Sequence, residues 1–360
     1  MKPIAHTMAL LGAILLLPIV VYAEGDTWID RLDFSGDLRL RYEEIRKETE
    51  ATASRARYRA RFGMSTHFSD NVEFVVGIAS GAYNPVSRNV TIDGELLNEG
   101  IGIDLLYVDW TPVEGMHVYV GKMKNPLFRA GNIPLVWDGD WNPKGIALNY
   151  SKGWFFGTLG SFLVEDRSSS SDSILLAGQV GAKFNFGENS TLTAGVGYFG
   201  YSNTIGNKPF YHDDPKGNTV DLLGNYVYEY KDTELFAQFD TKIGDLPFSL
   251  FAQSARNNEV VEQDFGIAYG ARLGSAKDKG QWELVWGYQD IEADSVIGTF
   301  NNSDFGGGGT DATGHIFVVR YVISENIDVG GTLFINTTNP FSLPEEDYER
   351  LQLDAVFNFE

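Results

Sequence analysis

The sequence predicts an all-β protein, a transmembrane antiparallel β-barrel of about 16 strands with short periplasmic turns and long extracellular loops. Three observations lead to this fold class. Apolar and polar side chains alternate along many short segments, which is typical of strands whose two faces meet different surroundings. The connections between these segments are alternately short and long. Beyond residue 23, no apolar run is long enough to cross a bilayer as a helix, so a membrane-embedded chain must use strands.

The alternation is clearest between Phe34 and Phe68. Apolar side chains such as Leu38 and Leu40 share one side of this predicted hairpin, and charged side chains occupy the other. A water-soluble sheet would leave the charged side in bulk solvent, whereas a membrane barrel turns the apolar side to lipid and the charged side to a wet lumen. The charged side consists of Asp37, Arg39, Arg41, Glu43, Arg55, Arg57, Arg59 and Arg61.

The remaining predicted strands follow in order along the chain. The even number of strands returns the C-terminus to the side on which the first strand begins, as in transmembrane barrels. The connections 83–100, 125–144 and 202–225 are long, and those near 69–71, 112–115 and 187–190 are short. The strands are expected at 72–82, 101–111, 116–124, 146–150, 154–165, 174–184, 192–198, a segment ending near 241, 248–254, 265–273, 282–288, 315–323, 327–336 and 351–359.

The N-terminus has the pattern of an export signal. Lys2 is followed by an apolar run from Met8 to Val21 and by a small-residue exit that ends at Ala23. This pattern predicts a cleaved signal peptide at 1–23 and a mature barrel at 24–360. A membrane anchor is the alternative, although the run is short and no stop-transfer segment follows. We therefore expect export to the bacterial outer membrane.

Composition argues against several classes of function. A formal net charge of −21 does not suit a nucleic-acid partner. The absence of cysteine excludes thiol catalysis and thiolate metal sites. His212, Asp213 and Asp214 are better explained by a solvated acidic loop than by a metal site, and Gly306–Gly309 by a flexible surface segment than by a phosphate loop. We predict no cofactor, no metal and no enzymatic activity, with a barrel phospholipase as a remote alternative.

Several motifs then resemble, in their order and spacing, the putative porin family of Gram-negative outer membranes. The resemblance implies a passive diffusion channel for small hydrophilic solutes and ions, embedded in outer-membrane lipids, and by analogy a homotrimer. Outer-membrane barrels usually end on an aromatic residue that the barrel-assembly machinery reads, whereas here Glu360 follows Phe359. The motifs are Phe34–Tyr42, Ala56–Gly63, Tyr107–Trp110, Gly121–Pro126, Val136–Asp140, Pro143–Gly145 and Gly280–Tyr288.

The connection 125–144 is too long and too apolar for a simple outer loop, so we expect it to fold inward and narrow the lumen. Asp138 and Asp140 would then face Arg39, Arg41, Arg57, Arg59 and Arg61, with Lys122 and Lys124 near the base of the loop. The resulting transverse field would orient dipolar solutes and select ions by sign.

Three alternatives remain open at this point. In the first, the arginines pair with Asp37, Glu43, Glu73 and Asp104 and only hold the wall together. In the second, the barrel has a plugged lumen and acts as an adhesin or a structural protein. In the third, the chain is a secreted β-sandwich that binds carbohydrate.

Overall fold

The computed structural model describes residues 31–81, 84–92, 100–168, 170–340 and 344–359. The predicted signal peptide lies outside these residues. By its internal contacts, the segment from Asp33 to Glu360 forms one compact unit. Within the described residues, no helix is both long and apolar enough to cross a membrane.

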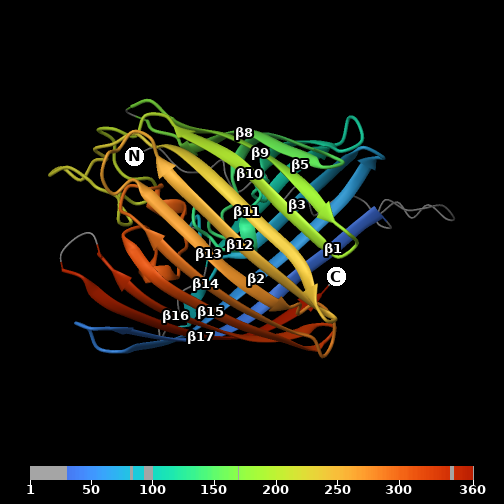
Figure 1. The fold of residues 1–360 in the computed structure, drawn as a ribbon. Coiled ribbons are helices and arrows are strands. Elements are labelled where there is room, and N and C mark those ends of the chain that lie inside the picture. The colour runs from blue at the N-terminus through green and yellow to red at the C-terminus, as the bar shows by residue number, and fades with distance from the viewer. Residues whose placement is uncertain (1–30, 82–83, 93–99, 169, 341–343, 360) are drawn as a thin grey trace. The chain divides into compact units, whose positions relative to one another are not determined.

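The described residues form one antiparallel sheet of seventeen strands, and sixteen of them close into a ring (Figure 1). Each ring strand pairs with its neighbours in sequence, and β1 pairs with β17 from Gly36↔Phe359 to Lys47↔Tyr348. The three-residue β4 pairs with β2 inside the connection between β3 and β5. The predicted barrel of about 16 strands is therefore confirmed. The strands are β1 (Leu32–Lys47), β2 (Ala53–Ser69), β3 (Val72–Ser80), β4 (Val90–Ile92), β5 (Ile101–Trp110), β6 (Met116–Lys122), β7 (Lys144–Lys152), β8 (Phe155–Glu165), β9 (Ser173–Phe186), β10 (Ser190–Tyr201), β11 (Lys231–Ile243), β12 (Leu246–Asn257), β13 (Phe265–Gly274), β14 (Trp282–Ile291), β15 (Ala312–Ser324), β16 (Ile327–Thr338) and β17 (Glu346–Phe359).

One end of the ring carries tight turns and the other carries long connections. Residues 153–154, 187–189 and 244–245 join consecutive strands at the first end, which also holds the start of β1 and the end of β17. Gly153 adopts φ +63° there, a left-handed conformation that glycine reaches without steric cost. At the opposite end, residues 202–230 and 292–311 are long connections.

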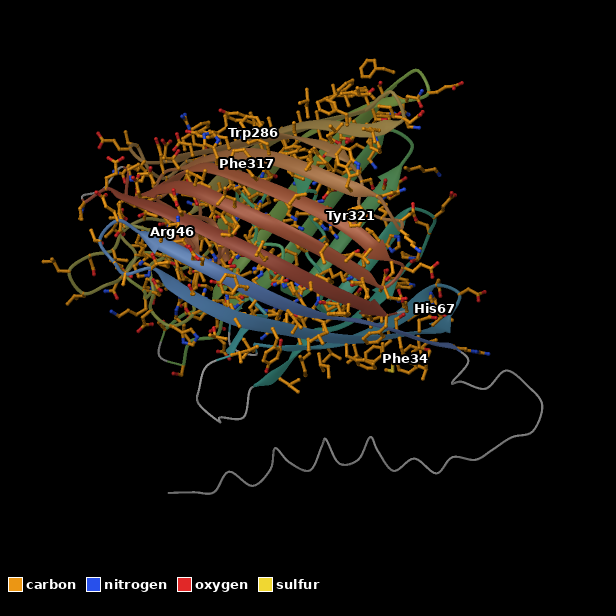
Figure 2. The ribbon with its side chains drawn as sticks, turned by 90° about the horizontal axis from the view of Figure 1, so that it is seen from below. Phe34, Arg46, His67, Trp286, Phe317 and Tyr321 are labelled. Carbon is orange, nitrogen blue, oxygen red and sulfur yellow. The ribbon has the colours of Figure 1, made fainter. Side chains whose placement is uncertain are left out.

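The two faces of the sheet differ as the alternation predicts. Phe34 and Leu40 are 44% and 45% exposed, whereas Asp37 and Glu43 on the same strand are 7% and 0% exposed. Large apolar side chains elsewhere on the ring are also exposed, and Phe34, Trp286, Phe317 and Tyr321 can be followed in Figure 2. A soluble sheet buries its apolar face, so this inverted arrangement is that of a barrel whose outer surface meets lipid.

A buried aromatic core lies on the inner side of the ring, within the three connections 123–143, 202–230 and 292–311. Trp137 stacks on Trp141 with ring centroids 4.2 Å apart, and Phe300 contacts both rings. Tyr226 from the connection 202–230 belongs to the same buried set. We call these segments loop 123–143, loop 202–230 and loop 292–311.

Loop 292–311 corrects one expectation. Gly306–Gly309 was expected to form flexible surface, but two of these glycines, Gly306 and Gly309, pack closely against other segments, while Gly307 is exposed. A Cβ at Gly306 would lie 2.7 Å from that of Ala312, and Gly309 lies against the backbone of Lys216. All four have positive φ, so here glycine serves close backbone packing rather than mobility.

Candidate functional site

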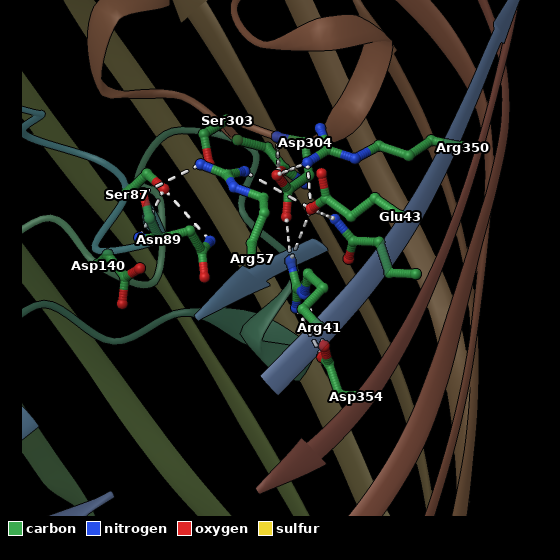
Figure 3. A network of polar contacts seen from close by, with 12 residues as sticks. Arg41, Glu43, Arg57, Ser87, Asn89, Asp140, Ser303, Asp304, Arg350 and Asp354 are labelled. Atoms are coloured by element: carbon green, nitrogen blue, oxygen red, sulfur yellow. Dashed lines mark hydrogen bonds and ion pairs between the residues drawn. The ribbon is translucent and has the colours of Figure 1, made fainter. Parts of the chain in front are cut away.

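Seven arginines and five carboxylates meet on the inner face of β1, β2 and β17. Figure 3 shows the part of this set around Arg41, Glu43 and Arg57. We call this set the arginine cluster. The strands supply most of it, because every second residue of a strand points to the same face. Two carboxylates come from loops, Asp140 from loop 123–143 and Asp304 from loop 292–311. The members are Arg39, Arg41, Arg55, Arg57, Arg59, Arg61 and Arg350, with Asp37, Glu43, Asp140, Asp304 and Asp354.

On β1 and β17 the cluster is densely paired. Arg41 binds Asp354 through two hydrogen bonds, of 2.6 Å from Nε and 2.7 Å from Nη2. Arg350 donates to Glu43 at 2.8 Å and lies 2.9 Å from Asp304. Burial alone would raise the pKa of Asp304, but Arg350 and Arg41 outweigh it and lower the pKa to about 2. Loop 292–311 is thus held against two strands by charge (Figure 3).

On β1 and β2, Asp37 joins two arginines. Its oxygens accept hydrogen bonds from Arg59 at 2.7 Å and from Arg61 at 2.6 Å. Asp140 lies 3.9 Å from both guanidinium groups, on the side of loop 123–143. The arginines therefore face a loop carboxylate and also pair along the wall, so the two interpretations of the sequence are not exclusive. Asp104, another proposed wall partner, pairs instead with Arg88 at 2.7 Å.

Arg39 and Arg57 are less completely paired. Arg39 donates from Nη2 to Asn89 Oδ1 at 2.5 Å, and Arg57 donates from Nη2 to the Asn89 carbonyl at 3.1 Å. Glu43 is the carboxylate nearest to Arg57, at 3.6 Å. Within the described part of the chain, Arg39 has no carboxylate oxygen within 4.0 Å. The Nε atoms of both arginines are buried and have no hydrogen-bond partner there.

Loop 123–143 runs along inward-facing side chains of β9, β11, β12 and β13. The Phe128 amide donates to Gln179 at 2.7 Å, and the Gly131 amide donates to Gln238 at 2.8 Å. In the other direction, Gln253 donates to the Ile133 carbonyl at 2.5 Å. Arg272 also donates to the loop, at the Gly131 carbonyl. These bonds satisfy backbone groups that would otherwise be buried without partners.

Asp138 does not face the arginines, contrary to expectation. It is 7% exposed, and its oxygens accept hydrogen bonds from the amides of Asp140 at 2.8 Å and Ser303 at 2.9 Å. Its own amide donates to the carbonyl of Phe300. Burial, followed by the neighbouring charge of Asp140, raises the pKa of Asp138 to about 7. Asp138 therefore joins loop 123–143 to loop 292–311.

The two lysines at the base of the loop separate. Lys122 is two residues after Val120 on β6, so its Cβ points to the same face of the sheet as Val120, which is 51% exposed on the outer face. The Lys122 ammonium donates to the Ile103 carbonyl at 2.7 Å. That carbonyl lies where the β5–β6 pairing has ended, so Lys122 does not join the arginines. Lys124 lies past the end of β6 and lines an inner cavity with Asp37, Arg61 and Asp140.

Polar cavities lie on both sides of the arginine cluster. The cavity toward the long connections measures about 750 Å³ and is lined by Arg57, Asn89 and Asp304 among others. Toward the tight turns, one cavity of about 440 Å³ contains Arg61 and Asp140, and another of about 300 Å³ contains Arg39, Arg59 and Asp354. The cluster thus lies between cavities on the sides of the long connections and of the tight turns.

In the segments that the structure describes, no three histidine or acidic side chains come close enough to hold an ion. His212 and Tyr211 line the cavity of about 750 Å³ toward the long connections. Both residues have positive φ.

Comparison with known families agrees with this arrangement. The sequence model of a family described as "Putative porin" matches residues 45–214 and 216–357. The chain belongs to this family. The match covers most of the chain and confirms the resemblance that the motifs indicate. It includes the arginine-cluster members from Arg55 onward, whereas those on β1 precede residue 45. No curated protein sequence matches the chain significantly.

Solved structures share the porin fold at low sequence identity. OprB of Pseudomonas putida, in its high-pH structure, is 12% identical with a TM-score of 0.63, over 92% of this chain and 95% of that one. The trimer form of OmpT, an outer membrane protein of Vibrio cholerae, is 15% identical with a TM-score of 0.51, over 91% and 99%. A triple mutant of the Rhodopseudomonas blastica porin is 13% identical with a TM-score of 0.51, over 91% and 100%. These likenesses establish the fold.

Proposed function

We propose that this porin-family protein is a passive diffusion channel for small hydrophilic solutes and ions in the bacterial outer membrane, without enzymatic turnover. The observation that carries the proposal is the pair of polar regions on either side of the arginine cluster, inside a closed ring with an apolar outer face. An enclosed polar interior offers a hydrated route that lipid does not.

In this proposal the narrowest part is formed by loop 123–143 together with loop 292–311. The hydrogen bonds from Gln179, Gln238 and Gln253 support an inward-folded loop, and Asp138 supports its connection to the second loop. We assign lining roles to the arginines, Lys124 and Asp140, while Asp138 positions the loops. Lys122 lines a separate cavity with Arg88 and Asp104 and is not part of this set. The lining arginines are Arg39, Arg41, Arg57, Arg59 and Arg61.

The proposal also includes three steps of biogenesis. Residues 1–23 act as a cleaved signal peptide for export, the barrel-assembly machinery inserts the barrel, and the inserted barrels assemble as a homotrimer. The trimer is supported by the fold shared with OmpT, one solved structure of which is described as a trimer form. The apolar outer face supports contact with outer-membrane lipids.

A plugged barrel is the second candidate, because the aromatic core of the three loops fills part of the interior. Conductance separates the two candidates. The full chain, folded in detergent and added to a planar bilayer in 1 M KCl, should produce discrete and reproducible conductance steps. Folded protein that inserts without raising the current would overturn the channel proposal and favour the plugged barrel.

A further inference from the structure

We propose that the arginine cluster contains a binding subsite for small oxyanions, centred on Arg39, Arg57 and Asn89, and that the channel therefore favours solutes bearing a carboxylate or phosphate group. This inference rests on the proposed channel function and specifies the class of solute that the same site prefers.

The first argument is uneven neutralisation. Arg41, Arg59, Arg61 and Arg350 each donate to a carboxylate oxygen at 2.6–2.8 Å. Arg39 and Arg57 instead use Asn89, a neutral residue, as their hydrogen-bond acceptor. The carboxylate nearest Arg57 is Glu43, and this group already accepts hydrogen bonds from Arg55 and Arg350. Two guanidinium charges thus remain short of counter-charge, as in a site that awaits an anion.

The second argument is the local charge. The cluster holds seven guanidinium groups and five carboxylates, a net charge of +2 when all are ionised. The whole chain has a net charge of −21, so its acidic groups must lie mostly elsewhere. Exposed charges act over about 8 Å at physiological ionic strength, whereas partly buried charges are screened less. An ion within the cluster therefore responds first to the local excess of positive charge.

The third argument is access from both sides. Arg57 and Asn89 line the cavity of about 750 Å³ toward the long connections. Arg39 lines the cavity of about 300 Å³ toward the tight turns. Asn89 bonds to both arginines, so Arg39 and Arg57 lie close together although they line different cavities. A solute moving between them passes one arginine and then the other.

The fourth argument is the chemistry of the groups. Arginine side chains carry only donors, and the two oxygens of Asn89 are already engaged by Arg39 and Arg57. A site rich in donors favours acceptors with negative charge, and the planar guanidinium matches the spacing of carboxylate and phosphate oxygens. Neutral sugars would lose the charge-assisted part of this interaction.

Selectivity in planar bilayers tests the subsite. Under a tenfold KCl gradient, the wild-type reversal potential should show preference for chloride. Succinate or inorganic phosphate at millimolar concentration should reduce the chloride current, whereas sucrose should not. The double variant Arg39→Gln with Arg57→Gln should lower the chloride-to-potassium permeability ratio roughly fivefold or more. In this variant, succinate and phosphate should no longer reduce the chloride current. The double variant Arg39→Lys with Arg57→Lys should retain the preference for chloride, because lysine keeps the positive charge. Succinate and phosphate should reduce its chloride current less than in the wild type, because lysine lacks the planar, bidentate guanidinium.

Arg46→Gln is the matched control, because Arg46 lies at the far end of β1 and its side chain is 59% exposed. It should behave as the wild type. Discrete conductance that prefers potassium, or that anions reduce equally in the wild type and the Gln variant, would overturn the oxyanion subsite and leave the channel proposal standing. Absence of conductance in the folded wild type would overturn the channel proposal itself.

Discussion

At the scale of single residues, Gly131 shows how tightly loop 123–143 fits the wall. It has φ +61°, and a Cβ at this position would overlap the ring of Phe251 on β12. Gly153 has nearly the same φ, +63°, but no atom lies within 4 Å of its would-be Cβ. Comparing alanine substitutions at these two glycines therefore separates the free-energy cost of a left-handed backbone from the cost of steric crowding.

We predict that Gly131→Ala lowers the free energy of unfolding by about 2–4 kcal/mol, because it adds crowding to a left-handed conformation. Gly153→Ala should cost about 1 kcal/mol, the backbone term alone. Urea unfolding of the barrel refolded into lipid vesicles measures both values. Equal losses at the two positions would show that loop 123–143 does not press against Phe251.

Asp138 should impose a pH dependence on stability. Its pKa in the folded barrel, about 7, lies above the ordinary value of 3.8, so folding favours the protonated form. The stability associated with this group is therefore complete below pH 4, falls as the pH rises from about 4 to 7, and stays low above that. Asp304, with a pKa lowered to about 2, acts oppositely, and only below pH 4.

Asp138→Asn should accordingly flatten the fall in the urea midpoint between pH 4.5 and pH 7.5, since asparagine does not titrate. The midpoint of the wild type, measured at the same pH values, provides the reference. An identical slope in both proteins would show that the Asp138 carboxyl does not titrate in this range.

At the scale of elements, Asp304 holds loop 292–311 to β1 and β17 through Arg41 and Arg350. Removing one member of a buried ion pair leaves the others uncompensated. Asp304→Asn should therefore destabilise the barrel by about 3 kcal/mol. It should also increase fluctuations of the open-channel current, because the loop loses its charged contacts. Asp214→Asn, which removes an exposed pair with Lys216, should cost less than about 1 kcal/mol. A quiet current and unchanged stability in Asp304→Asn would contradict this role.

The sequence predicted the elements better than the connections between them. Strand alternation has a period of two, so the inner position of Arg41 and the outer position of Leu40 follow from parity alone. The same rule could have identified Arg350 and Asp354, which alternate with Leu351 and Leu353 on β17.

The same alternation could also have corrected the prediction for Lys122, which alternates in step with Val118 and Val120 on β6 and not with the arginines. On β5 the parity changes within the strand, because the pairing with β3 shifts register between Gly77 and Ile78. Ile103 and Leu106 consequently both belong to the exposed face.

Loops have no such period, and their contacts are not local. Asp138 and Asp140 are two residues apart, yet one bonds to the backbone of loop 292–311 and the other approaches Arg59. Nothing in the sequence of loop 292–311 indicates that Asp304 will meet Arg350. Its glycines could be read equally as mobile surface or as sites of close packing.

At the scale of the whole molecule, the account depends on the inverted distribution of side chains around the ring. The outer face is apolar and exposed, and the inner face carries the charges and the polar cavities. Neighbouring residues of one strand, such as Arg39 and Leu40, should therefore meet different solvents.

Single-cysteine accessibility tests this claim most directly, because the chain has no cysteine of its own. Arg39→Cys and Leu40→Cys would be introduced separately, and a charged, water-soluble methanethiosulfonate reagent would be added during single-channel recording. We predict that Arg39→Cys reacts and that its current falls in a discrete step, while Leu40→Cys neither reacts nor changes its current. Reaction at Leu40→Cys with protection of Arg39→Cys would contradict the assignment of the two faces and, with it, the channel.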